Sequence, residues 1–159
     1  MTLNQLLPIT RRDPSSTSHL FLGQHQTLLA RSEETGGAFA LIEEVVQAGL
    51  EPPRHTHTHE DESFYVLDGQ LEFSIGEDTH PATQGDFVFL PRGLPHAFKL
   101  QTPTARLLVL LTPGGFERLF LSMATPVSEA QGPPEPAAFQ QLLREAPEHG
   151  IRWDAPLQP

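Results

Sequence analysis

Short runs of apolar residues alternate with turns along most of the chain, and the turns are rich in proline and glycine. The 159 residues include 16 Pro and 12 Gly, which leave little room for long helices in the middle of the sequence. Short apolar runs between regularly spaced turn signals are typical of an all-β sandwich or barrel. The pattern predicts strands over residues 19–23, 26–30, 38–46, 63–67, 71–75, 86–90, 96–100 and 105–111, with Asp68-Gly69 as a tight turn between two of them.

Two segments near the C-terminus have a helical period instead. Residues 114–124 and 137–146 each repeat apolar side chains every three or four positions, which predicts two short helices. Residues 128–136, SEAQGPPEP, are polar and rich in proline and are interpreted as a linker between them. We expect the first helix to pack on the barrel rather than to line a channel, through Phe116, Leu119, Phe120 and Met123.

The length of the chain fits one domain with a single core. We expect a β-barrel domain with its N-terminal strands over residues 1–112, and a C-terminal helical extension that packs on the barrel over residues 113–159. The N-terminal segment has neither the basic start and apolar run of a signal peptide nor an apolar stretch long enough for a membrane span. A soluble, cytoplasmic protein is therefore expected.

Composition and charge narrow the possible partners and the possible chemistry. The chain has 10 Lys and Arg against 20 Asp and Glu, a formal net charge of −10. Such a surface repels phosphate backbones and anionic lipids, so neither nucleic acid nor a membrane is an expected partner. The chain has no cysteine, which excludes disulfide scaffolds, zinc–thiolate sites and cysteine nucleophiles. Any metal must therefore bind to nitrogen and oxygen ligands.

Histidine and acidic residues gather in the stretch RHTHTHEDESFYVLDG, residues 54–69. His55 and His57 are two positions apart, so on a strand both side chains leave the same face. The polar residues that follow predict a turn between Thr58 and Asp61, which resets the alternation and allows Glu62 to point inward with the apolar residues after it. An unpaired carboxylate inside a barrel is very costly. A divalent cation held by the two histidines would offset that cost.

A third imidazole comes from a later strand. His96 alternates in phase with Phe98 and Leu100, so it belongs to the apolar, inward-facing set of its strand. Three imidazoles and one carboxylate are borderline ligands that suit Fe, Mn, Ni, Cu, Co or Zn and leave open coordination positions for other ligands. The sequence predicts one divalent transition metal per chain, bound by His55, His57, Glu62 and His96.

The spacing of these residues resembles the two sequence motifs of the cupin superfamily. The first motif has Gly, five residues, His-x-His, four residues, Glu, six residues and Gly, and it is matched in full by Gly49, His55, His57, Glu62 and Gly69. The second has Gly, five residues, Pro-x-Gly, two residues, His, three residues and Asn. It is matched by Gly85, Pro91, Gly93 and His96, with Leu100 in place of the Asn, which is not a metal ligand in the family. The likeness covers residues 49 to 100 and extends through flanking strands from about 20 to 112.

The resemblance implies a single-domain cupin: a double-stranded β-helix, or jelly-roll barrel, with short C-terminal helices, expected to form a homodimer through a barrel face. Residues 60–73 and 113–120 are also similar to bacterial cupins grouped near quercetin dioxygenases. This implies a dioxygenase-like oxidoreductase that acts on a small organic, possibly flavonol or other aromatic, substrate, with Glu62 as catalytic base. Because cupins carry many activities, a non-catalytic metal-containing sensor or store of a small molecule and a cupin isomerase stay open. A degenerate cupin without metal is also open.

Several nearby residues have competing interpretations. His59 either replaces His55 in the ligand set or faces solvent, and the spacing to Glu62 favours the second. Glu60 and Asp61 are interpreted as a solvated turn rather than an acid–base pair, and Arg92 as an exposed turn residue rather than a contact for an anionic substrate. We expect a place in the core for most of Phe64, Phe73, Phe87, Phe89 and Phe98.

Overall fold

Two antiparallel β-sheets form the body of the molecule in a computed structural model, which describes residues 6–10, 17–129 and 134–154. The larger sheet has seven strands in the order β11 (Thr125–Pro126), β1 (Ser18–Phe21), β2 (Gln24–Ala30), β3 (Ala40–Gln47), β10 (Thr104–Thr112), β5 (Asp61–Asp68) and β8 (Phe87–Leu90). The smaller sheet has five, in the order β12 (Ile151–Trp153), β4 (His55–His57), β9 (His96–Leu100), β6 (Gln70–Ile75) and β7 (Asp78–Thr83). All strand pairs are antiparallel, as in a jelly roll.

The core lies between the two sheets, where alternate side chains of each strand meet. Strands β3 and β10 show the alternation most clearly, because buried and less buried residues succeed one another along both. The largest fully buried apolar side chains come from both sheets and from the first helix: Phe73, Leu28, Ile42, Leu71, Leu90, Leu107, Leu111 and Leu119.

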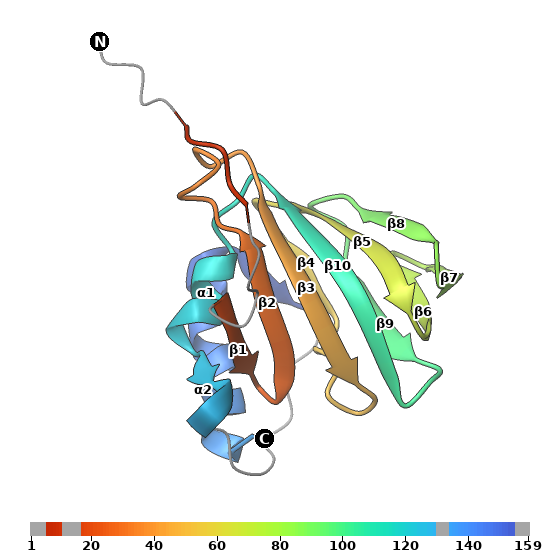
Figure 1. The fold of residues 1–159 in the computed structure, drawn as a ribbon. Coiled ribbons are helices and arrows are strands. Elements are labelled where there is room, and N and C mark those ends of the chain that lie inside the picture. The colour runs from red at the N-terminus through yellow and green to blue at the C-terminus, as the bar shows by residue number, and fades with distance from the viewer. Residues whose placement is uncertain (1–5, 11–16, 130–133, 155–159) are drawn as a thin grey trace.

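Short helices lie on the β1–β2 side of the molecule (Figure 1). Helix α1 (Glu117–Ser122) follows β10, and helix α2 (Pro136–Glu145) continues into a 3₁₀ turn, η3 (Ala146–His149); another 3₁₀ turn, η2 (Val127–Glu129), follows β11. Both predicted helices are therefore confirmed. The middle of the predicted linker, residues 130–133, lies outside the described residues. None of the helices in the described part of the chain is long and apolar enough to cross a membrane.

The predicted all-β fold is confirmed, and each of the eight predicted strands is present, with ends at the predicted residues or a few residues away. The other four strands are β4, which the placement of His55 and His57 had assumed, and β7, β11 and β12, which were not predicted. Two of them, β11 and β12, come from the segment after residue 112 and join the larger and the smaller sheet respectively. The division into domains at residue 112 stays a prediction, as do the homodimer and the cytoplasmic location.

The expectation that most of the five phenylalanines lie in the core is confirmed, with two exceptions. Phe64 and Phe73 are buried and Phe98 packs against the core, whereas Phe87 and Phe89 are 63% and 51% exposed. Both exposed rings lie on β8, the edge strand of the larger sheet. Val88 and Leu90 alternate with them and supply the inward side of this strand, where Leu90 is 1% exposed. The alternation along the strand therefore puts the two larger side chains on the outer face.

Candidate metal centre

Three strands bring the predicted ligands together at one point between the sheets. His55 and His57 lie on β4, His96 lies on the adjacent β9 directly opposite His55, and Glu62 lies on β5 of the other sheet. One possible ligand atom from each of these side chains lies within 4.8 Å of all the others, and all are buried. The chain bends at residues 58 and 59, before β5 begins at Asp61, in agreement with the predicted turn. The structure thus brings together all four candidate ligands.

The three imidazole rings are held by hydrogen bonds through the same nitrogen. Nδ1 of His55 lies 2.7 Å from the Pro53 carbonyl oxygen, and Nδ1 of His96 lies 3.1 Å from the Leu94 carbonyl oxygen. Since a carbonyl only accepts, both rings must donate through Nδ1. Nδ1 of His57 lies 3.4 Å from Glu60 Oε2, a carboxylate acceptor. Neutral rings in this tautomer present the Nε2 lone pair, which is the arrangement that fixes histidine ligands in metal sites.

The Nε2 atoms of two of the rings lack a hydrogen-bond partner among the described residues, and a metal ion could take its place. Within the described part of the chain, Nε2 of His57 and Nε2 of His96 are buried and have no hydrogen-bond partner. They lie 3.7 Å and 3.3 Å from Glu62 Oε2. Buried polar atoms without partners are rare and costly. Two orphaned nitrogens beside one carboxylate oxygen therefore fit a divalent cation bound by three histidines and a glutamate.

The charges in the centre act strongly on one another. Burial alone would raise the pKa of Glu62, but the fields of the three histidines, that of His57 above all, outweigh it and hold the pKa at about 2. Burial also lowers the pKa of His55 to about 4, with help from the positive fields of His57 and His96. At His57, burial is outweighed by the carboxylates of Glu62 and Glu60, so its pKa is raised. Without metal, the site therefore favours an ionised Glu62 beside a neutral His55.

An apolar cavity of about 360 Å³ adjoins the four candidate ligands. Most of its wall is aromatic or aliphatic, with side chains from both sheets and both α-helices. The Phe116 ring of the segment before α1 meets His57 edge to face at 4.6 Å between centroids, and the Trp153 ring of β12 meets His55 at 5.9 Å. A pocket of this kind, apolar with a few convergent polar groups, suits a small organic ligand.

The first helix packs on the barrel as predicted, but it also contributes to the cavity wall. Phe116 and Leu119 are buried against the barrel as expected, but Phe116 and Phe120 also line the cavity. The same apolar face, Phe116 to Phe120, thus packs on the barrel and forms part of the cavity wall.

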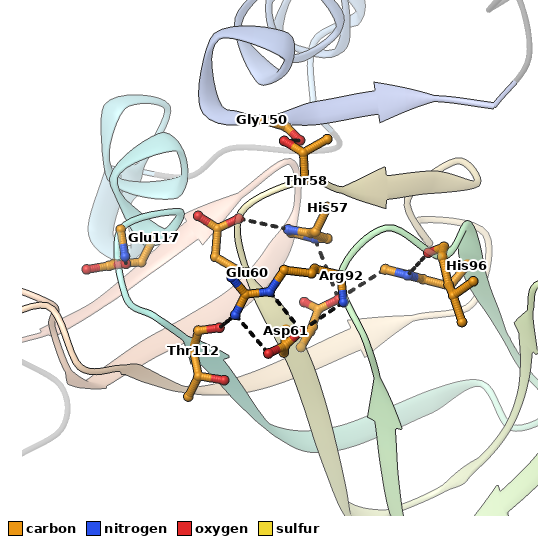
Figure 2. Close-up of polar contacts among 12 residues, drawn as sticks. His57, Thr58, Glu60, Asp61, Arg92, His96, Thr112, Glu117 and Gly150 are labelled. Atoms are coloured by element: carbon orange, nitrogen blue, oxygen red, sulfur yellow. Dashed lines mark hydrogen bonds and ion pairs between the residues drawn. The ribbon is translucent and has the colours of Figure 1, made fainter.

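Of the residues around the centre, His59 and Arg92 have the predicted exposure and Glu60 does not. His59 is exposed, in agreement with the preferred interpretation. Glu60 was expected in a solvated turn, but it is 6% exposed and contacts His57 Nδ1 (Figure 2). The interpretation was wrong because the buried imidazole needs an acceptor on its outer nitrogen. Arg92 is exposed as expected and forms an ion pair with Asp61, with Nη2 2.8 Å from Oδ2 (Figure 2).

Sequence reasoning missed several residues around the cavity. Trp153 lies on a three-residue strand whose pairing partner is far away in the sequence, and no local pattern predicts that contact. Glu44 is different, because it alternates in phase with Ile42 and Val46 and is buried with them. The alternation of buried residues along β3 would have predicted a second inward-facing carboxyl group.

Residues 42–112 match the family profile described as a cupin domain. The chain contains a cupin domain. The matched residues include all four candidate ligands, and the fold around them is the all-β jelly roll that the sequence motifs implied.

Curated relatives of this cupin domain include two quercetin 2,3-dioxygenases. The chain is 28% identical over 128 residues to the enzyme of Bacillus subtilis (strain 168), an alignment that covers 80% of this chain and 38% of that protein. It is 32% identical over 85 residues to the enzyme of Aspergillus japonicus, which covers 50% of this chain and 24% of that protein. The alignments thus span well under half the length of these two relatives.

A solved structure with a similar fold is that of Pac13 from Streptomyces, described as a nucleoside dehydratase. The TM-score is 0.56 at 14% sequence identity, and the match covers 69% of this chain and 88% of that one. At this identity the likeness concerns the fold alone. The fold therefore does not by itself determine which reaction the protein catalyses.

Proposed function

We propose that His55, His57, Glu62 and His96 bind one divalent transition ion, and that the protein is a dioxygenase-like oxidoreductase for a small aromatic substrate with metal-chelating oxygens. The observation that carries the metal is the pair of buried, unpartnered Nε2 atoms of His57 and His96 beside Glu62. The aromatic cavity wall and the likeness to two quercetin 2,3-dioxygenases support the substrate class.

A bound ion would supply Lewis acidity and open coordination positions beside the cavity. The residues of the chain supply the rest. The Nδ1 hydrogen bonds of the three histidines fix the ring orientations, so the Nε2 atoms need no reorganisation when an ion binds. The apolar wall excludes water and orients a flat substrate against the centre.

Glu62 is the candidate base for a substrate hydroxyl next to the centre. Its carboxylate is buried in the cavity wall and ionised at neutral pH, since its pKa is held at about 2. So low a pKa makes it a weak base while the histidines surround it. Its catalytic role therefore requires that the carboxylate leave the imidazoles as it accepts the proton.

The test begins with elemental analysis of protein purified without a tag, which should show about one transition ion per chain. Oxygen uptake and product formation are then measured with flavonols, catechols and diketones, on protein loaded in turn with iron, manganese, nickel, copper and cobalt. We expect turnover with at least one combination. Absence of uptake and product in every combination would refute the oxygenase proposal, and tight binding of the same compounds without turnover would instead support a metal-containing sensor or store.

A further inference from the structure

A row of polar side chains crosses the inner face of the larger sheet, away from the candidate ligands. His19 on β1 lies opposite Gln26 on β2, and Gln26 lies opposite Glu44 on β3. All three are buried, at 6%, 1% and 8% exposure. The row becomes apolar on the next strands, where Leu107 of β10 lies opposite Glu44 and Val66 of β5 lies opposite Leu107.

Hydrogen bonds along the row have a fixed direction. His19 Nε2 lies 3.1 Å from Gln26 Oε1, and because an amide oxygen only accepts, the imidazole must donate. Gln26 Nε2 then donates to Glu44 Oε1 at 2.9 Å. Oε2 of Glu44 has no hydrogen bond to any described residue, and Glu44 lines the cavity. The row thus forms a hydrogen bond with Oε1 of Glu44, while Oε2 remains able to bind a ligand in the cavity.

The remaining acidic side chains of the cavity wall are engaged or exposed. Glu51 accepts from the backbone N–H of Leu100 through one oxygen and from that of Gly49 through the other. Glu135 is exposed at the start of α2. Among the described residues of the cavity wall, and apart from the candidate metal ligand Glu62, Glu44 is therefore the buried carboxyl group with an oxygen that accepts no hydrogen bond.

The protonation state of Glu44 limits which ligand groups can form a hydrogen bond with it. Burial raises the pKa of Glu44 to about 7, the hydrogen bond from Gln26 opposes the rise, and the negative field of Glu62 adds to it. A ligand hydroxyl satisfies the group in either state, because a hydroxyl can donate to a carboxylate and accept from a carboxylic acid. An ether or a ketone can only accept, and an apolar group leaves the buried oxygen unpaired.

We propose that Glu44 is a second anchor in the cavity, which binds a hydroxyl group of the ligand while the metal centre holds the chelating oxygens of the same molecule. The substrate class narrows accordingly to hydroxylated aromatic chelators, in which a flat apolar body separates the chelating group from a further hydroxyl. This inference rests on the proposed function for the chelating end. The Glu44 end depends on the row His19–Gln26–Glu44.

Flavonols provide matched probes for the second anchor. The probes are 3-hydroxyflavone, which carries the chelating group alone, and a series of flavonols that each add one ring hydroxyl. Binding is measured on protein loaded with Zn²⁺, which is redox-inert, through the fluorescence of Trp153, the one tryptophan of the chain, which lines the cavity. We expect at least one added hydroxyl to increase affinity about tenfold, the effect of one good hydrogen bond.

Three variants assign that gain to Glu44. Glu44→Leu should reduce the gain to less than about twofold while affinity for 3-hydroxyflavone and zinc content stay unchanged. Glu44→Gln, which keeps a hydrogen-bonding group, should retain most of the gain. If Glu44→Leu does not fold, the double variant Gln26→Leu/Glu44→Leu replaces both partners of a buried hydrogen bond with apolar groups and serves in its place. Glu135→Gln, at an exposed carboxylate of the same cavity, is the control and should behave like the wild type.

The outcomes separate this inference from the proposed function. Failure of the zinc-loaded wild type to bind any flavonol contradicts the substrate class proposed above. Binding of flavonols with the same hydroxyl gain in the wild type and in the leucine variants overturns the role of Glu44 alone. A uniform loss of affinity for all probes in Glu44→Leu also overturns it, since a purely structural role predicts that result.

Discussion

Acidification of the metal-free protein should bring a destabilising contribution from the buried ring of His55. The ring is buried beside two other imidazoles, and burial together with the fields of His57 and His96 lowers its pKa from 6.5 to about 4. In the unfolded chain the same ring has its ordinary pKa and takes up a proton as the pH falls below 6.5. Protons therefore favour the unfolded state in the window from pH 6.5 down to about pH 4.

The size of the effect follows from the width of that window. Each pH unit below 6.5 costs about 1.36 kcal/mol while the folded ring stays neutral. Between pH 6.5 and pH 5 the contribution of His55 is thus a loss of about 2 kcal/mol in the free energy of unfolding. His57 adds no slope there, because a raised folded pKa gives a contribution that is complete below 6.5. Glu62 adds none either, because the stability from its lowered pKa is lost only below about 4.5. Glu44 acts in the opposite direction, because its pKa is raised to about 7 and the folded state therefore gains stability as the pH falls below that value.

Urea denaturation of the chelator-treated wild type and of His55→Gln at pH 7.5 and pH 5 isolates the contribution of His55, because Glu44 and His57 titrate in both proteins. Between the two pH values, the change in the free energy of unfolding should be about 2 kcal/mol more favourable in the variant than in the wild type. The matched control is His59→Gln, at an exposed histidine of the same stretch, which should follow the wild type. An equal change in the free energy of unfolding in the wild type and in His55→Gln would refute the contribution assigned to His55.

Further predictions concern the metal and the base. His57→Ala and His96→Ala should empty the site and His59→Ala should not; full metal occupancy by elemental analysis in the first two would contradict the ligand assignment. At matched metal occupancy, Glu62→Gln should lower turnover roughly 100-fold to 10,000-fold, and a fall no larger than the loss of metal affinity would reject the base role. Saturation with metal at about 100 times its Kd should add about 2.7 kcal/mol of stability, which for a chain of this size raises Tm by roughly 5–10 °C. Calorimetry should find no such shift in His96→Ala.

The candidate centre could be predicted because its residues obey local rules. His55 and His57 share a strand face, His96 keeps phase with the apolar residues after it, and the turn before Glu62 resets the alternation. These relations depend only on the side-chain period of a strand. The same rule applied to β3 would have identified Glu44 as an inward-facing residue.

Other features could not be predicted, for equally physical reasons. The run Phe87–Leu90 is apolar throughout, so its pattern does not tell which alternate residues face out. Glu60 is followed by two more acidic residues, like many solvated turns, and only the position of His57 Nδ1 in space explains its burial. Strand β12 is three residues long and pairs across a separation that no local window spans.

The pairing of β12 with β4 also bears on how the centre is completed during synthesis. All four candidate ligands precede β11 in the chain, yet β4 is only three residues long and has a single residue pair with β9, His55 with His96. Its other cross-strand pairs, three in number, are with Ile151–Trp153. The hydrogen bond from Thr56 Oγ1 to Asp154 Oδ1 ties the same strand to a residue 98 positions later. A nascent chain that ends at β10 thus carries every candidate ligand but lacks the strand that braces two of them. We therefore expect the proposed metal site to reach its finished geometry only after translation has reached β12.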